Sequence, residues 1–389
     1  MATKQMWSRI GAPLAPDQPR MQDTVADSSV GQPRAGMPTT LKALLNGIVA
    51  EPVEETRWLV LADWLDENDD PRRGELLRLH RNLLATCCEP GKHPQRAVWR
   101  ARLVELLGRG VLPCVPQRKV ILPDRVSMTF SFIPAGTFWM GSNHKDASAR
   151  IKPAHTVTLT RSFFMGVHPV TQEQWRSVMN MPASGTGSIN SGWNSGSPPD
   201  WELSSWQNGR RWDDQGRDFS HFKGATLPME QVTARDAEEF CRRLTTYLNG
   251  TATVQLPTEA QWEFACRAGT TTHYQKYQTG DSDLALKKAG WYMANSGART
   301  HPVRHMTPNA WGLYDLHGNV WEWCRDTHSA YTTEHVIDPI RTDRGADRIC
   351  RGGAWNSPAD ACLAAARETR RTDDISSDLG FRVVLVLPA

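Results

Sequence analysis

The sequence lacks the features that mark a membrane protein or a nucleic-acid-binding protein. No run approaches the roughly 18 apolar residues that cross a bilayer, and residues 1–6 do not form the apolar core of a signal peptide. The formal net charge is only +3 over 389 residues, with Lys and Arg dispersed among Asp and Glu. These absences give no case for a membrane span or a nucleic-acid partner, and we expect a cytoplasmic protein.

Zinc-binding spacing is also lacking among the eight cysteines. Cys87 and Cys88 are adjacent and the other cysteines lie far apart. We therefore expect free thiols, mostly buried, as is usual in a reducing compartment. Tryptophan, by contrast, is abundant, with 16 copies in the chain. This excess favours a loop-rich fold whose interior is filled by large rings.

The chain divides into three parts. Residues 1–38 contain several Pro, Gly, Ser and Asp residues without periodicity, which predicts a disordered leader. Residues 39–115 carry apolar side chains at helical spacing and predict a small helical domain, and residues 118–389 make the third part. The spacing of the first two helices is set by Leu41, Leu44, Leu45, Ile48, Trp58, Leu61, Trp64 and Leu65.

Within the helical part, the run Trp58–Leu65 is followed by the polar run Asp70-Pro71-Arg72-Arg73-Gly74-Glu75. This combination resembles a short helical domain that recurs in planctomycete-type bacterial proteins. No biochemical role comes with that resemblance. We expect an amphipathic helix group that docks on another surface, with the charged run as a solvated face and helix cap.

Residues 118–389 predict an α+β domain. Period-two alternation predicts strands at 130–141 and 155–160, and the apolar run 381–387 predicts a central strand. The stretch 181–222 is rich in Gly, Ser, Asn and Trp, so it is either an active loop or a flexible insertion. Helix starts are predicted at Thr171, at Thr233, and at Thr258 with Gln261 as its capping-box partner.

Six segments of this third part occur in a characteristic order, and together they resemble the formylglycine-generating enzyme (sulfatase-modifying factor) family. The resemblance covers about residues 130–387 and implies a loop-rich α+β fold of the C-type-lectin type. The segments are Ile133-Pro134-Ala135-Gly136 with Met140-Gly141, Pro169-Val170-Thr171, Leu256-Pro257-Thr258-Glu259-Ala260 with Trp262-Glu263, Gly318-Asn319-Val320-Trp321-Glu322-Trp323, Arg351-Gly352-Gly353, and Gly380-Phe381-Arg382.

The family's activity requires two thiolates. Its enzymes oxidise a cysteine of a substrate protein to formylglycine with oxygen and copper(I), a soft ion that accepts two-sulfur coordination. The resemblance places the second of these cysteines at Cys362 and the first at Ser357, whose hydroxyl is a poor copper(I) ligand. A serine that assists in the family's active site is matched by Ala354. Copper is therefore expected only if the protein works as an oxidase.

Further site residues follow from the same resemblance. Trp321, Arg367 and Asp378 match residues of the family's pocket, and Trp355 stands beside the twin glycines Gly352-Gly353 and can cover their turn. For Arg367 and Arg382 the alternative is a buried ion pair with Asp373, Asp374 or Asp378.

The resemblance to the family also implies a calcium site. Asp315, Gly318, Val320 and Glu322 match a family site in which carboxylates and carbonyls supply the hard oxygens that calcium prefers. The alternative is a glycine turn in which Glu322 accepts backbone N–H bonds. The family's second calcium site falls in a shortened segment, 295–300, and we expect it to be absent.

Three functions remain open from the sequence. The first is a binding module with a degenerate copper site that recognises a protein or peptide ligand. The second is an active oxidase that uses Cys362 alone or together with Cys324 or Cys350. The third is a lectin-like ligand-display protein diversified by a retroelement. The oligomeric state is not set by the sequence.

Overall fold

The computed structural model describes residues 21–22, 38–88, 93–180, 219–269, 275–343 and 347–388. Almost all of the predicted leader and of the predicted loop 181–222 lies outside these residues, so both remain predictions. No helix in the described ranges combines the length and apolar character needed to cross a membrane.

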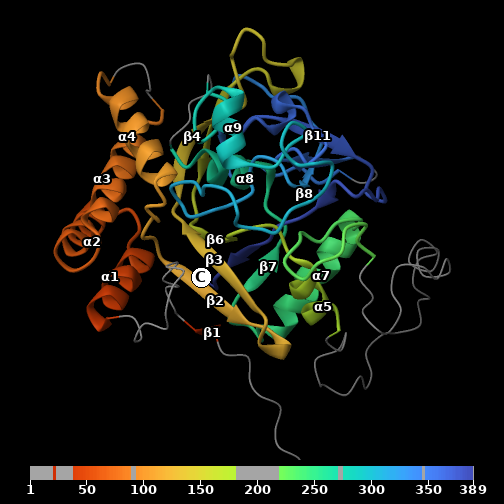
Figure 1. Ribbon diagram of the computed structural model, residues 1–389, viewed down its shortest axis with the longest axis horizontal. Coiled ribbons are helices and arrows are strands. Elements are labelled where there is room, and N and C mark those ends of the chain that lie inside the picture. The colour runs from red at the N-terminus through yellow and green to blue at the C-terminus, as the bar shows by residue number, and fades with distance from the viewer. Residues whose placement is uncertain are drawn as a thin grey trace, which may run out of the picture.

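The four helices of the N-terminal part lie where the apolar spacing predicts them. They run along one side of the molecule (Figure 1) and are α1 (Thr39–Ala50), α2 (Glu55–Asn68), α3 (Pro71–Ala85) and α4 (Arg96–Gly108). Asp70 caps α3 by accepting the amide of Arg72, and Pro71 stands at the first helical position, where no amide is needed. The predicted stop at 68–71 is therefore confirmed.

These helices pack onto the rest of the chain. The Nε2 atom of His80 donates to the carbonyl of Ala268 at 2.9 Å, and its ring meets Trp311 edge to face. Arg96 reaches the carbonyl of Gly269 at 2.6 Å. Buried apolar side chains of the helices and of the main body belong to a single continuous cluster. The helical part therefore docks on the main body, a choice of surface that the sequence did not determine.

The largest sheet runs through the core and has the strand order β1-β2-β3-β6-β13-β7. All its pairs are antiparallel. The predicted C-terminal strand is confirmed in position, because β13 lies between β6 and β7, although it is shorter than the apolar run. The strands are β1 (Met21–Gln22), β2 (Gln117–Ile121), β3 (Ser127–Ile133), β6 (Phe163–Gly166), β7 (Thr253–Gln255) and β13 (Val384–Val386).

Two smaller sheets complete the mixed α+β body. One has the order β11-β10-β8-β12 and the other β4-β5-β9. Their strands are β8 (Trp321–Thr327), β10 (Arg348–Arg351), β11 (Arg367–Arg370) and β12 (Leu379–Gly380), then β4 (Gly136–Met140), β5 (His155–Leu159) and β9 (Val336–Ile337).

Three of the remaining described helices begin at the predicted caps, and α9 begins after Ser282, which was not predicted. Thr171, Thr233 and Thr258 each form a reciprocal capping box with the residue three positions on, which is Gln174, Asp236 and Gln261 respectively. The helices are α5 (Gln172–Met179), α7 (Ala234–Tyr247), α8 (Glu259–Arg267) and α9 (Asp283–Ala289), with 3₁₀ turns at Pro123–Arg125, Ala149–Ile151 and Ala359–Cys362.

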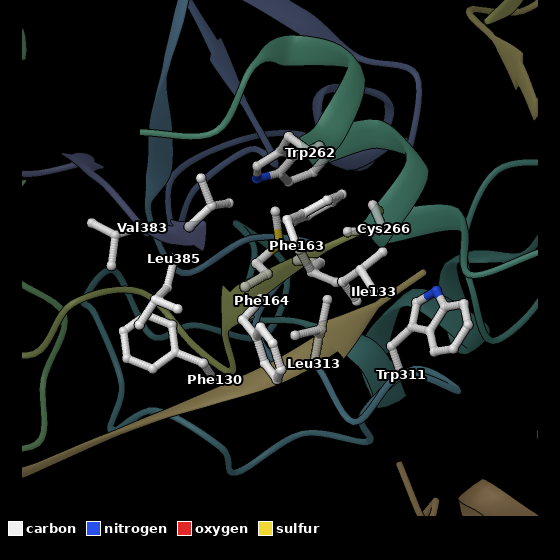
Figure 2. Close-up of a cluster of buried hydrophobic side chains, with 14 of the residues drawn as sticks. Phe130, Ile133, Phe163, Phe164, Trp262, Cys266, Trp311, Leu313, Val383 and Leu385 are labelled. Carbon is white, nitrogen blue, oxygen red and sulfur yellow. The ribbon is translucent and has the colours of Figure 1, made fainter. Parts of the chain in front are cut away.

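Large rings fill the interior, as the tryptophan content predicts. Trp58, Trp262, Trp311 and Trp323 are all fully buried. Figure 2 shows Trp262 on α8 above a layer of side chains from the central sheet, with Phe164 in the middle. Because α8 rests on this layer, the sheet holds Trp262 and its neighbours directly beneath the loops of residues 351–362.

Candidate functional site

A twin-glycine turn follows β10 and sets the geometry of the candidate site. Gly352 and Gly353 have φ values of +101° and +74°, a region that side chains with a Cβ rarely adopt. A Cβ on Gly353 would lie 2.5 Å from the sulfur of Cys362, and one on Gly352 would lie 3.1 Å from the ring of Trp262. The glycines therefore let this turn pack directly against Cys362.

Ser357 and Cys362 both lie beside the amide of Ala354. The amide donates to Ser357 Oγ at 3.0 Å, and Ser357 is buried. Cys362 is fully buried among Tyr277, Leu286 and Tyr292. Burial, with a smaller effect of Asp360, raises the pKa of the Cys362 thiol to about 12, although the Ala354 amide acts in the opposite direction. The thiol is therefore protonated at neutral pH.

No second thiol joins Cys362 in the described structure. Cys324 and Cys350 lie on the neighbouring strands β8 and β10, both fully buried, and neither is among the groups that shift the pKa of Cys362. Cys266 contacts His317, which bonds the backbone carbonyl of Cys362, not its sulfur.

The donor set at the turn is therefore one buried thiol and one hydroxyl. A hydroxyl is a hard ligand, so these residues do not fit a two-sulfur copper(I) site. Among the described residues, no group of three or more His, Cys, Asp or Glu side chains is placed to hold a metal.

Three of the four predicted ligand-binding residues come together at this turn. Trp321 donates its amide to the carbonyl of Asp378 at 2.7 Å, and Trp355 Nε1 donates to the carbonyl of Ser377 at 3.0 Å. Asn356 Nδ2 donates to Asp378 Oδ2 at 3.2 Å. Two tryptophans and a carboxylate thus meet beside the turn, and we call them the pocket wall because the resemblance places the family's substrate pocket here.

The second carboxylate oxygen of Asp378 is the chemically notable atom of this wall. Asp378 is 6% exposed, and its Oδ1 is buried without a hydrogen-bond partner among the described residues. Arg370 lies 3.5 Å from Oδ2. A buried acceptor without a donor costs free energy that a ligand's N–H or O–H group can recover.

Arg367 lies apart from this pocket wall. Its guanidinium donates to Glu259 Oε2 at 2.7 Å and to the carbonyl of Ser329, and it covers the ring of Tyr331. The alternative of an ion pair with Asp373, Asp374 or Asp378 is wrong for Arg367, because its partner is Glu259.

The arginine that faces Asp378 is Arg370, which the sequence reasoning missed. Arg367 and Arg370 stand three positions apart on β11, and side chains at that spacing point to opposite faces of a strand. The period-two alternation of side chains along a strand is the sequence signal that assigns Arg367 and Arg370 to different faces of β11. Asn356 was also missed, although it directly follows Trp355 in the chain.

Three of the predicted calcium ligands, Asp315, Gly318 and Val320, lie in the turn before β8, whereas Glu322 lies in β8 and already has a cationic partner. Arg382 donates to both of its carboxylate oxygens at 2.7 Å, and Trp262 Nε1 donates to Oε2 at 2.6 Å. The alternative partners expected for Arg382 are thus also wrong, and the donors to Glu322 are side chains rather than backbone amides. To bind calcium, the Glu322 carboxylate would have to give up these donors.

Asp315 is the other carboxylate of the predicted calcium site. It accepts the amide of Arg304 at 2.8 Å, and burial is the main cause that raises its pKa to about 6. Gly318 and Val320 lie within the same turn, where the Val320 amide donates to the Gly318 carbonyl at 3.0 Å. Calcium binding by these four residues stays a prediction from the resemblance.

The described cavities lie away from this site. One of about 210 Å³ opens between α1 and β2, with Lys42, Arg118 and Phe164 among its lining residues. A smaller one lies beside Arg304 and Tyr314. Neither is lined by the residues of the twin-glycine turn.

Comparison with known proteins gives three findings. Residues 120–387 match the family model described as a sulfatase-modifying factor enzyme 1-like domain. The formylglycine-generating enzyme of Mycobacterium tuberculosis is 29% identical over 306 residues, covering 65% of this chain and 96% of that protein. The serine/threonine-protein kinase Pkn1 of Chlamydia trachomatis is 29% identical over 270 residues, covering 68% of this chain.

The match spans only 39% of the length of that kinase. Among solved structures, the variable protein 1 of Treponema denticola is similar, with a TM-score of 0.56 and 27% sequence identity. That similarity covers 70% of this chain and 99% of the Treponema chain.

Proposed function

Because the chain belongs to the family of sulfatase-modifying factor enzyme 1-like domains, we propose that it is a formylglycine-generating-enzyme-like module that binds a protein or peptide ligand. In this proposal the C-type-lectin-like body carries a degenerate copper site, with Ser357 in place of the first catalytic cysteine. The fold reports the family, whereas only the site reports the chemistry.

One observation carries the proposal: the family's copper position offers a single sulfur. Cys362 is buried and protonated at neutral pH, and Ser357 Oγ accepts the Ala354 amide. A copper(I) ion held by two sulfurs needs a second soft donor that this turn does not supply. The scaffold around the turn is kept, which favours retained recognition over retained oxidation.

The adjoining pocket wall indicates the ligand's chemistry. Asp378 Oδ1 needs a hydrogen-bond donor, such as an amide or a cationic side chain. The indole of Trp355 meets the ring of Phe222 edge to face at 5.4 Å, and Met293 is 62% exposed next to Ser357. A peptide with an apolar group beside a donor group matches this combination.

Selection of displayed peptides on the full chain tests the binding proposal. We expect enriched peptides whose affinity falls at least tenfold in Asp378→Asn, because the amide then presents its own N–H groups to the donor of the ligand. The matched control is Asp374→Asn, because Asp374 also lies 3.5 Å from Arg370 but is more exposed. Equal loss in both variants, or none in either, would remove this pocket from the proposal.

The alternative is an active copper- and oxygen-dependent oxidase, favoured by the similarity to formylglycine-generating enzymes. It is tested by incubating wild-type protein with copper(I), oxygen and cysteine-containing peptides and measuring aldehyde. Aldehyde from the wild type overturns the degenerate-site proposal. A peptide that binds but is not oxidised supports it.

A ligand-display protein of the diversified kind is the third candidate. It is favoured by the shared fold with a solved protein described as variable. A near-repeat of the C-terminal coding segment beside the gene is the observation that separates it from an invariant binding module.

A further inference from the structure

Two adjacent cysteines lie outside the site described so far. Cys87 and Cys88 follow α3 directly after its C-cap residue, Thr86, and their sulfur atoms are 3.7 Å apart. Both are partly exposed, whereas the other six cysteines of the chain are buried. They are therefore the thiols that a reagent in solution can reach.

The two thiols converge on one carbonyl of the main body. Cys87 Sγ donates to the carbonyl of Thr137 at 3.0 Å and Cys88 Sγ donates to it at 3.3 Å. In return, Trp139 Nε1 donates to the carbonyl of Cys88 at 3.0 Å. Thr137 and Trp139 belong to β4, so this cluster joins the end of α3 to the β4-β5-β9 sheet.

We propose that Cys87 and Cys88 form a reversible dithiol–disulfide site that is oxidised by a low-molecular-weight disulfide. Oxidation requires the two sulfurs to approach from 3.7 Å to the roughly 2.0 Å of an S–S bond. Adjacent Cα atoms are only about 3.8 Å apart, below the usual span of roughly 4.4–6.8 Å across a disulfide, so the peptide between the two cysteines must also distort and the bond is readily reduced again.

The reaction proceeds by two exchanges. One cysteine, as its thiolate, attacks a sulfur of the small disulfide and releases one small thiol, leaving a mixed disulfide on the protein. The other cysteine attacks the protein-bound sulfur, which forms the Cys87–Cys88 bond and releases the second small thiol. Two electrons thus pass to the small disulfide, and the protons of both cysteines end on its products.

The surroundings set the rate and the consequence of this exchange. Hydrogen bonding to Cys88, then burial, raises the pKa of the Cys87 thiol, so the rate should increase with pH as the thiolate becomes available. The disulfide carries no S–H groups. The Thr137 carbonyl then loses both thiol donors, and the contact between α3 and β4 is weakened.

The test is treatment of the full-length reduced protein with oxidised glutathione, followed by tryptic mapping. Residues 82–92 form one tryptic peptide that contains both cysteines. We expect this peptide to lose two hydrogens in the wild type. Cys87→Ser and Cys88→Ser should each keep a glutathione adduct on the remaining thiol, since the second exchange has no attacking group.

Internal controls make the result decisive. Cys324 and Cys350 lie on neighbouring strands but are fully buried, so they should stay reduced under the same treatment. Phenylarsine oxide, which needs two thiols, should bind the wild type and neither serine variant. A wild-type peptide that stays unreacted, or that stops at the glutathione adduct, overturns the proposal. Circular dichroism checks that the variants are folded.

Discussion

The hydroxyl of Ser357 accepts a hydrogen bond from the amide of Ala354 at 3.0 Å. The same amide acts on the Cys362 thiol, so the two side chains share one polar neighbour at the base of the twin-glycine turn. A sulfur at position 357 would therefore share this amide neighbour with the Cys362 thiol.

Ser357→Cys should create a copper(I) site that the wild type lacks. The change supplies a second soft sulfur beside Cys362, and copper(I) binding would release the proton that burial keeps on the thiol. We expect stoichiometric copper(I) in competition with a chromogenic chelator. Ser357→Ala is the control and should bind no more than the wild type. Equal copper binding by wild type and Ser357→Cys would contradict the degenerate-site proposal.

Glu263→Gln should strongly destabilise the fold. Burial alone would raise the pKa of Glu263, but Arg267 and Arg351 hold it below its ordinary value, and Arg267 lies 2.6 Å away. Neutralising this fully buried carboxylate removes the nearest charge partner of Arg351, which keeps Glu259 at 3.5 Å, and the ion pair of the buried Arg267. We expect a loss of about 3–5 kcal/mol in urea unfolding.

The control for this ion-pair prediction is Asp373→Asn. Asp373 pairs with Arg371 at the surface, where water screens the interaction, so stability should be nearly unchanged. A similar loss for both variants would show that burial is not what makes the Glu263 pair important.

Acid should destabilise the protein through buried neutral histidines. Burial lowers the pKa of His80 from 6.5 to about 3, and lowers those of His168 and His317 to about 4. Below pH 6.5 the unfolded chain takes up protons that the folded chain does not, so stability present above that pH is lost as the pH falls toward 4. Each histidine contributes up to about 1.4 kcal/mol per pH unit.

The measurement is the free energy of unfolding at pH 7 and pH 5, for wild type and His80→Gln. A glutamine amide can still donate to the Ala268 carbonyl but does not titrate, so the pH dependence should weaken in this variant. If the free energy of unfolding depends on pH equally in His80→Gln and in the wild type, then His80 has the same protonation state in the folded and the unfolded chain.

Gly353→Ala should cost more stability than Gly297→Ala. Both glycines have left-handed φ values, +74° and +61°, and this conformation costs an alanine about 1–2 kcal/mol. At Gly353 the new Cβ would also clash with the Cys362 sulfur, whereas a Cβ at Gly297 would have no atom within 4 Å. Equal costs in thermal or urea unfolding would mean that the turn can move away from Cys362.

Much of the local structure could be predicted because short-range contacts decide it. The capping boxes at Thr171, Thr233 and Thr258 each involve a partner three residues on, so the sequence contains both members. The helices of residues 39–115 followed from their apolar spacing in the same way. The family resemblance and the serine at position 357 could likewise be recognised from the sequence.

Partner choice between distant segments could not be predicted. Glu322 matched a calcium ligand in sequence, yet its carboxylate meets Arg382, which lies 60 positions later. Arg367 matched a pocket residue, yet it pairs with Glu259 across the core. A single sequence records which charges exist but not which of several opposite charges the folded chain brings within 3 Å.

The sequence by itself therefore determined the family, the helix starts at Thr171, Thr233 and Thr258, and the presence of a serine at position 357. Only the tertiary structure decided that the buried Oδ1 of Asp378 has no hydrogen-bond donor among the described residues, and that Arg370 rather than Arg367 faces this carboxylate. It also decided that the thiols of Cys87 and Cys88 both donate to the Thr137 carbonyl. The physical reason is range: backbone capping and periodicity act within a few residues, whereas these contacts depend on how segments far apart in the chain pack together.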